Sequence, residues 1–109
     1  NCIELDTAHY YNIPINIVVH NDEAWGFCES TQLALYNDTS ATKIGATRYD
    51  KIAEAFGGVG KNVANMDDLT DSIKSVLQCE VFSCLNVAVN SDILAPGATM
   101  FNESLKRMR

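Results

Sequence analysis

The stretch that most constrains the fold covers residues 14–26 and reads PINIVVHNDEAWG. Residues 15–19 form a mostly apolar run of strand length, which is typical of a strand buried on both faces of a parallel sheet. The run stops at three polar residues, Asn21, Asp22 and Glu23. Because ligand sites of open α/β sheets lie just beyond the carboxyl ends of such strands, this polar turn is the first candidate site.

The side chains of this turn allow two interpretations. A carboxamide and a carboxylate, Asn21 and Asp22, suit a hard cation or a hydroxyl-rich ligand. The same residue types commonly form turns or cap helices, and His20 and Trp25 beside them are residues that often pack in a core. No Ser-His-Asp set, phosphate-binding glycine loop or zinc pattern is recognisable. Local chemistry therefore indicates a cation or polar-ligand site at a strand end and leaves a purely structural role open.

Composition bounds the class of protein. With 109 residues and 47% hydrophobic content, the chain can form one small domain with a core. A formal net charge of -6 argues against nucleic acid or an anionic membrane as partner. No apolar stretch approaches the roughly 20 residues that span a bilayer. We expect a cytoplasmic protein whose four cysteines are reduced and mostly buried, with a disulfide framework as the less favoured alternative.

Helices and short apolar strands alternate along the chain, which predicts an α/β fold with a parallel sheet flanked by helices. Further strands are predicted at residues 59–63 and 81–89. Helices are predicted at residues 2–12, 29–35 and 49–56, after a cap at Asn65, and at 100–109. Residues 36–48 are predicted to form a loop, and Pro96-Gly97 a break before the last helix. In the first helix, the apolar positions Ile3, Leu5, Ala8 and Tyr11 are expected to face the core.

The order of these motifs resembles the thiamine-diphosphate-binding segment of the acetolactate synthase group. In that family a GDG triplet precedes a helix with an N-x-x-E-L-x-T-A pattern, an aromatic-N-L/I-P turn, a strand and an N-N-x-x-x-G elbow. The corresponding letters here are NCIELDTA at residues 1–8, YNIP at 11–14 and IVVHNDEAWG at 17–26. The stretch YDKIAEAFGG at 49–58 and residues 66–89 resemble the following helices and last strand. The resemblance therefore covers essentially the whole chain.

The resemblance implies a site for Mg²⁺ and for the diphosphate of the cofactor. Asp22 stands at the second asparagine of the family's pair and is implied to bind the ion together with the backbone carbonyl of Ala24, with Asn21 as a less favoured ligand. The amides of Ala24, Trp25 and Gly26 are implied to face the diphosphate. Asp22 departs from the family's asparagine and adds a negative charge beside the ion. The GDG triplet, which supplies a further ligand in the family, lies outside the chain.

The resemblance also implies a function. The chain would be the C-terminal part of a thiamine-diphosphate- and Mg²⁺-dependent 2-keto acid decarboxylase or carboligase, closest to the acetolactate synthase large subunit. It would form a single partial domain, residues 1–109, whose partners are the remaining domains of the same enzyme in a homodimer or homotetramer. It would supply no catalytic residue, because the glutamate that activates the cofactor comes from the partner subunit in the family. The isolated chain is then expected to be inactive.

Three alternatives stay open at this point. Within the family, the chain could belong to a 2-hydroxyacyl-CoA lyase or oxalyl-CoA decarboxylase relative, or to a catalytically silent relative. From another class, it could be a non-catalytic flavodoxin-like α/β binding module. That module predicts a self-contained, stable monomer, whereas the partial-domain hypothesis predicts an exposed apolar surface.

Overall fold

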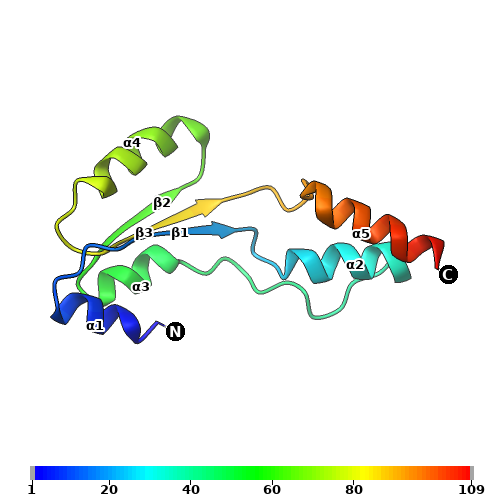
Figure 1. Cartoon of the computed structure of the whole chain (residues 1–109), viewed down its shortest axis with the longest axis horizontal. Helices are drawn as coiled ribbons and strands as arrows, with labels where there is room; N and C mark the ends of the chain where they lie inside the picture. Colours follow the sequence, from blue (N-terminus) through cyan, green and yellow to red (C-terminus); the bar gives the residue numbers. More distant parts are fainter. Residues whose placement is uncertain (1, 109) are drawn as a thin grey trace. The chain divides into compact units, whose positions relative to one another are not determined.

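The computed structural model of the protein describes residues 2–108. Within that range the elements follow the order α1 (Glu4–Tyr10), β1 (Asn16–Asn21), α2 (Gly26–Tyr36), α3 (Tyr49–Ala55), β2 (Val59–Val63), α4 (Met66–Leu77), β3 (Ser83–Ala88) and α5 (Pro96–Arg107) (Figure 1). The chain divides into two compact units. Unit 1 comprises the residues up to Asn21 together with Arg48–Val89, and unit 2 comprises Asp22–Thr47 together with the residues from Asn90 onward.

Unit 1 is built on a three-stranded parallel sheet with the order β1-β3-β2. In the central strand, Ser83 is the register partner of both Asn16 and Val59. Helices separate these parallel strands along the chain, as crossover connections require. The predicted α/β fold with a parallel sheet flanked by helices is confirmed.

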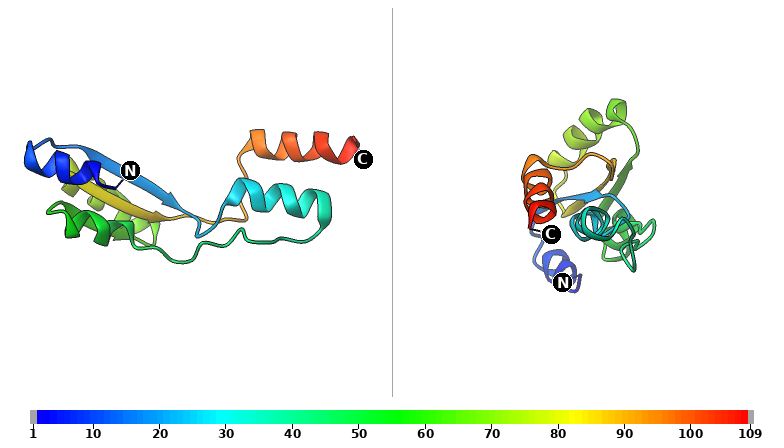
Figure 2. Two further views of the ribbon diagram at one scale, coloured as in Figure 1. Left: turned by 90° about the horizontal axis from the view of Figure 1, so that it is seen from below. Right: turned by 90° about the vertical axis from the view of Figure 1, so that its right-hand side faces the viewer.

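Helices cover both faces of this sheet (Figure 2). On one face α1 and α3 bury Ala8 and Ala53 against Phe82 and Cys84, with Leu5, Ile17 and Val19 packed around them. On the other face α4 packs Val76 against Val63 and Leu85. Unit 1 is thus a three-layer sandwich of helices, sheet and helix.

The prediction that the first strand is buried on both faces was wrong. Burial alternates along β1, and Val18 is 52% exposed. The reason is that α4 packs over β2 and β3, so within residues 2–108 this helix leaves the face of β1 that carries Val18 uncovered. The prediction for Ile3 and Tyr11 was also wrong: both are exposed because they flank the short helix α1, in which Ala8 is the buried residue.

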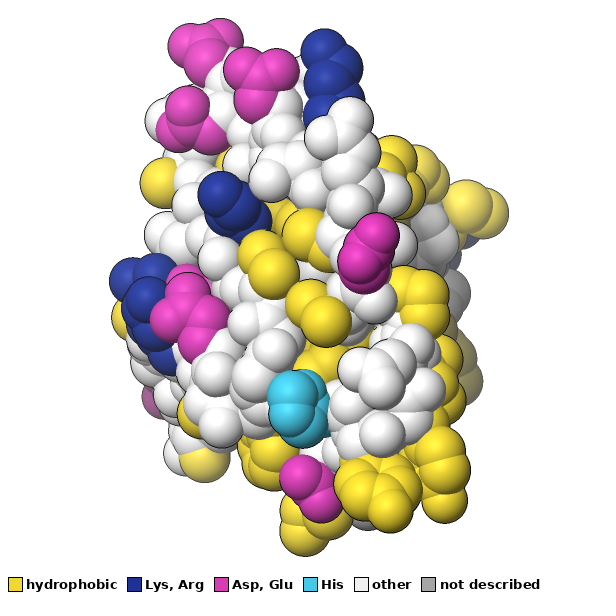
Figure 3. Space-filling view, turned by 90° about the vertical axis from the view of Figure 1, so that its left-hand side faces the viewer, with side chains coloured by type: hydrophobic (Ala, Val, Ile, Leu, Met, Phe, Trp, Pro, Cys, Tyr) yellow, Lys and Arg dark blue, Asp and Glu magenta, His cyan; other side chains and the backbone are white. Residues whose placement is uncertain are grey.

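Unit 1 exposes many large hydrophobic side chains. Figure 3 shows hydrophobic side chains exposed between polar and charged ones. The exposed residues include Ile3, Tyr10, Tyr11, Ile13, Val18, Met66 and Leu77. An exposed apolar surface is what the partial-domain hypothesis predicts, while the extent of the domain itself stays a prediction.

Most helix boundaries follow from local signals. The side chain of Asn65 accepts a hydrogen bond from the Asp68 amide at 3.0 Å, so this residue caps α4 as predicted. Gly57 follows α3 with a φ of 86°, the left-handed conformation that ends helices at glycine. The prediction of a break at Pro96-Gly97 was wrong, because Pro96 begins α5, where its missing N–H costs no hydrogen bond.

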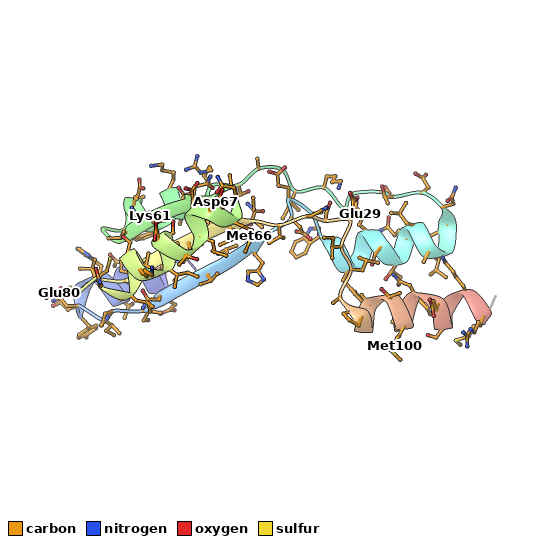
Figure 4. All side chains as sticks on the ribbon, turned by 90° about the horizontal axis from the view of Figure 1, so that it is seen from above. Glu29, Lys61, Met66, Asp67, Glu80 and Met100 are labelled. Atoms are coloured by element: carbon orange, nitrogen blue, oxygen red, sulfur yellow. The ribbon has the colours of Figure 1, made fainter. Side chains whose placement is uncertain are left out.

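In unit 2, α2 and α5 lie side by side and run in the same direction (Figure 2). The rings of Phe27 and Phe101 pack between them with centroids 5.5 Å apart. Buried polar groups also join the helices: the Asn102 amide donates to Ser30 Oγ at 3.2 Å and accepts from Thr31 Oγ1 at 3.2 Å. Met100 projects from α5 on the side away from α2 (Figure 4).

The four cysteines are free, as predicted. Cys84 is buried in the sheet and Cys79 is half-buried, whereas Cys2 and Cys28 are exposed. The prediction of mostly buried cysteines was therefore wrong for two of the four, since Cys2 precedes α1 and Cys28 lies on an uncovered side of α2.

An ion pair between the half-exposed Arg48 and the buried Asp50 lies at the start of α3. The Asp50 side chain is only 2% exposed and accepts from Arg48 Nε at 2.8 Å and from Arg48 Nη2 at 2.6 Å. The hydrogen bonds and charge of Arg48 hold the pKa of the Asp50 carboxyl below its ordinary value of 3.8. Because the folded pKa is depressed, this pair stabilises the fold above that value, and the contribution is lost as the pH falls through the lower, folded pKa.

We expect Arg48→Met to lower the melting temperature at pH 7, because it leaves the buried Asp50 carboxylate without its charged partner. The difference from wild type should shrink as the pH is lowered below 3.8, because the stabilisation by the pair is lost progressively until the pH falls below the depressed pKa of Asp50 in the folded wild type. Melting followed by circular dichroism between pH 7 and pH 3 measures this. Lys51→Met is the control, since it removes an exposed pair with Glu54. A pH-independent difference for Arg48→Met would contradict the assignment.

Candidate functional site

The predicted site residues lie where β1 ends and unit 2 begins. Asn21 is the last residue of β1 and is nearly buried. Its side-chain amide donates to Asn86 Oδ1 at 3.1 Å, and the Asn86 amide donates in turn to Asn62 Oδ1 at 2.7 Å. These three side chains form a row across the three strands of unit 1. The Asn21 amide nitrogen is therefore committed to the sheet.

Asp22, the next residue, forms a tight turn at the start of unit 2. Its Oδ1 accepts a hydrogen bond from the Ala24 amide at 3.2 Å, and the intervening Glu23 has a φ of 57°. Its Oδ2 lies where a Cβ on Gly26 would stand, so any side chain at that position would overlap the carboxylate. A side chain at position 26 would therefore have to displace the Asp22 carboxylate from this position.

A second segment, residues 42–45, holds this turn in place by backbone hydrogen bonds. The Trp25 amide donates to the Thr42 carbonyl at 2.7 Å, and the Ile44 and Gly45 amides donate to the Glu23 carbonyl at 3.0 and 3.3 Å. This pairing sets Ala24 opposite Lys43 in an isolated antiparallel bridge. Both Ala24 and Thr42 are buried. The turn is consequently a fixed structure within unit 2.

The backbone carbonyls of Glu23, Ala24 and Trp25 differ in whether they accept hydrogen bonds. The Glu23 carbonyl accepts the two hydrogen bonds just described, and the Trp25 carbonyl accepts the Glu29 amide at 2.9 Å. Between them, the carbonyl of Ala24 accepts no hydrogen bond from residues 2–108. A carboxylate and an uncommitted backbone carbonyl therefore belong to one turn. Hard oxygen donors of this kind suit Mg²⁺.

These donors make up only part of a coordination shell. Nowhere in residues 2–108 do three or more His, Cys, Asp or Glu side chains gather so that they could hold a metal ion. Mg²⁺ accepts such partial protein shells, because it commonly binds one or two protein groups together with phosphate oxygens and water. Asp22 and Ala24 thus fit the role of two ligands among several.

The backbone amides of the turn differ in their availability. Those of Ala24 and Trp25 donate within the chain, to Asp22 and Thr42. The Gly26 amide begins α2, where the first-turn N–H groups have no intrahelical acceptor. The side chain of Trp25 is 61% exposed and that of His20 is exposed, so neither packs in the core as the structural interpretation expected.

Charged side chains surround the first turn of α2. Lys43 Nζ lies 2.9 Å from Glu29 Oε1. The pKa of Lys43 is raised first by this hydrogen bond and then, against partial desolvation, by the charges of Glu29, Asp22 and Asp92. Sequence reasoning missed Lys43, because the backbone pairing that brings it to Ala24 joins residues far apart in the chain.

Unit 2 also contains a cavity of about 450 Å³ between α2 and α5. Gly26 and Glu29 line it from α2, Lys43 from the connection, and Asn102 and Lys106 from α5. Gly26 is therefore shared by the Asp22 turn and the lining of this cavity. The sequence carried no signal for this cavity, since α5 was predicted to start later.

Residues 1–87 match the family model described as thiamine pyrophosphate enzyme, C-terminal TPP binding domain. The chain belongs to this family. The match includes Asp22, Ala24 and Gly26, whereas α5 lies beyond it. Membership argues against the flavodoxin-like module of another class. The fold described above is accordingly that of a C-terminal TPP binding domain of this family.

Individual members of the family are also similar to this chain. Acetolactate synthase of Bacillus subtilis (strain 168) is 33% identical over 90 residues, which are 83% of this chain and 16% of that protein. Oxalyl-CoA decarboxylase of Escherichia coli (strain K12) is 30% identical over 89 residues, 81% of this chain and 16% of that protein. 2-Hydroxyacyl-CoA lyase 2 of Caenorhabditis elegans is 26% identical over 82 residues, 75% of this chain and 12% of that protein. The chain thus spans less than a fifth of the length of these curated relatives.

No helix in residues 2–108 combines the length and the apolar character needed to cross a membrane.

Proposed function

We propose that this chain anchors the diphosphate of thiamine diphosphate through Mg²⁺ in a 2-keto acid decarboxylase or carboligase of the acetolactate synthase type. The observation that carries the proposal is the Asp22 turn, where a fixed carboxylate and an uncommitted carbonyl at Ala24 offer two hard oxygen ligands. The similarity to acetolactate synthases supports the reaction class.

Each residue of the turn has a part in this proposal. Asp22 and Ala24 hold the ion, the Ala24 amide fixes the Asp22 carboxylate, and the Gly26 amide faces a diphosphate oxygen at the start of α2. Bound thiamine diphosphate supplies an electron sink for the carbanion left by decarboxylation. The residues of this chain bind and orient the cofactor, and we assign no proton transfer to them.

The remaining parts of the assembly belong to the proposal as well. We propose that other domains of the same enzyme, in a homodimer or homotetramer, supply the third metal ligand and the catalytic groups. The net charge of -6 gives no support to a nucleic acid partner. Free cysteines are consistent with a cytoplasmic enzyme.

The proposal is tested by calorimetric titration of the full-length protein with thiamine diphosphate and Mg²⁺. We expect Asp22→Ala to weaken cofactor binding by roughly 100-fold, about 2.7 kcal/mol, because it removes a metal ligand. Asp22→Asn should bind nearly as wild type, since the amide oxygen is also a hard donor. Asp71→Ala, which removes an exposed carboxylate on α4, is the control. Tight binding by Asp22→Ala would remove this residue from the metal site.

A second reaction within the family is favoured by the similarity to oxalyl-CoA decarboxylase, whose identity to this chain is nearly as high. The two candidates differ in substrate class, a 2-keto acid or an acyl-CoA. Turnover of pyruvate against oxalyl-CoA by the full-length protein separates them. Carbon dioxide release from oxalyl-CoA alone would replace the carboligase assignment and leave the cofactor site unchanged.

A further inference from the structure

Lys43 is held beside the Asp22 turn by two independent contacts. Its backbone lies opposite Ala24 in the antiparallel bridge. Its Nζ lies 2.9 Å from Oε1 and 3.0 Å from Oε2 of Glu29. Glu29 projects from the first turn of α2 toward the connection between α2 and α3 (Figure 4). The ammonium group is therefore fixed at the same helix turn that begins with Gly26.

Lys43 lines the same cavity as Gly26, the residue beside which the Asp22 carboxylate lies. Lys43, Glu29 and Gly26 line the cavity of about 450 Å³ in unit 2. Asp22 Oδ2 occupies the position that a Cβ on Gly26 would take. The charges of Asp22 and Asp92 both act on Lys43. Glu29 thus contacts the Lys43 ammonium group directly, and two further carboxylates, those of Asp22 and Asp92, act on it through their charge.

This arrangement has a definite electrostatic consequence. Without Lys43 the turn would strongly favour a divalent cation but would repel an anionic diphosphate, because Asp22, Glu29 and Asp92 are all negative. A diphosphate brings more negative charge than a single Mg²⁺ neutralises. A fixed ammonium group at this position opposes binding of the free ion and favours binding of the ion together with diphosphate.

We propose that Lys43 is a further cofactor-binding residue, whose ammonium group compensates the Asp22 carboxylate and attracts the diphosphate to the turn. This inference rests on the function proposed above. It adds a residue of the connection between α2 and α3 to the site. It also assigns Glu29 the role of holding the Lys43 side chain in place.

The proposal predicts opposite effects of one substitution on two ligands. In the full-length protein, Lys43→Gln should weaken thiamine diphosphate binding at saturating Mg²⁺ by about three- to tenfold, the size expected for one partly solvated charge. The same variant should tighten the binding of Mg²⁺ titrated without cofactor. Because the Lys43 side chain is 65% exposed, both effects should decline as salt is raised. A purely structural role would not move the two affinities in opposite directions.

Two comparisons make the test decisive. Lys51→Gln, which breaks the exposed Lys51–Glu54 pair in unit 1, should change neither affinity. In Asp22→Asn the effect of Lys43→Gln on Mg²⁺ binding should become smaller, because the carboxylate that Lys43 compensates is gone. Circular dichroism checks that each variant is folded.

The outcomes separate this inference from the proposed function. If wild type binds and Asp22→Ala abolishes binding while Lys43→Gln behaves like Lys51→Gln, the inference about Lys43 is wrong and the proposed function stands. Changes of both affinities in the same direction would also overturn it. If wild-type protein does not bind the cofactor with Mg²⁺, both proposals are wrong.

Discussion

Replacing Phe82 by alanine is expected to destabilise the fold by about 3–5 kcal/mol, the usual cost of emptying a large aromatic position in a core. Phe82 is fully buried and packs in the cluster with Ala8 and Ala53, on the face of the sheet covered by α1 and α3. Its ring also fills the space beside Gly58, where an added Cβ would overlap it. The surrounding residues belong to three different elements and cannot all close on the cavity.

Urea unfolding of the protein followed by far-ultraviolet circular dichroism measures this loss. Phe101→Ala is the matched control, because Phe101 is 44% exposed and its ring packs against Phe27 on the surface of unit 2. We expect that variant to lose only about 1 kcal/mol. Equal losses for the two variants would show that Phe82 is not a central packing residue.

Gly60→Ala is the second substitution with a large expected effect, a loss of about 2–4 kcal/mol from overpacking. Gly60 lies in β2, and a Cβ there would overlap the backbone carbonyl of Asp50 in α3. A backbone atom cannot rotate away as a side chain can. The start of α3 is also fixed by the Arg48–Asp50 pair and by the fully buried Ala53. Substitution should therefore separate α3 from the sheet.

Gly97→Ala is the control for this substitution. Gly97 lies in the first turn of α5, and an added Cβ would meet no atom within 4 Å. Since alanine favours the helix more than glycine does, we expect a neutral or slightly stabilising effect, up to about 1 kcal/mol. Chemical unfolding of both variants compares them directly. A stable Gly60→Ala protein would contradict the close packing of α3 on β2.

The sequence predicted those parts of the fold whose signals are local. Strand β2 and the Asn65 cap each depend on a few neighbouring residues, and both are confirmed. The burial of β1 depends on where α4 packs, which is tertiary information that an apolar run does not contain. A break was predicted at Pro96 in place of the start of α5, because a proline followed by a glycine is as typical of a break as of a helix start.

The candidate site likewise has one part that local sequence predicts and another that depends on tertiary contacts. The positions of Asp22, Ala24 and Gly26 were obtained from a motif that is continuous in sequence. The commitment of the Trp25 amide to Thr42 and the approach of Lys43 arise from pairing between distant segments. No periodicity or composition within either segment encodes that pairing. The ligand atoms of the candidate site could therefore be predicted from the sequence, whereas the charge that Lys43 brings to it could not.

A crystal structure of the full-length protein with thiamine diphosphate and Mg²⁺ tests the central claim most directly. We predict the ion at about 2.0–2.1 Å from one carboxylate oxygen of Asp22 and from the carbonyl oxygen of Ala24, with diphosphate oxygens completing the shell. An ion or diphosphate bound elsewhere, with the Asp22 carboxylate contacting only the Ala24 amide, would contradict the account.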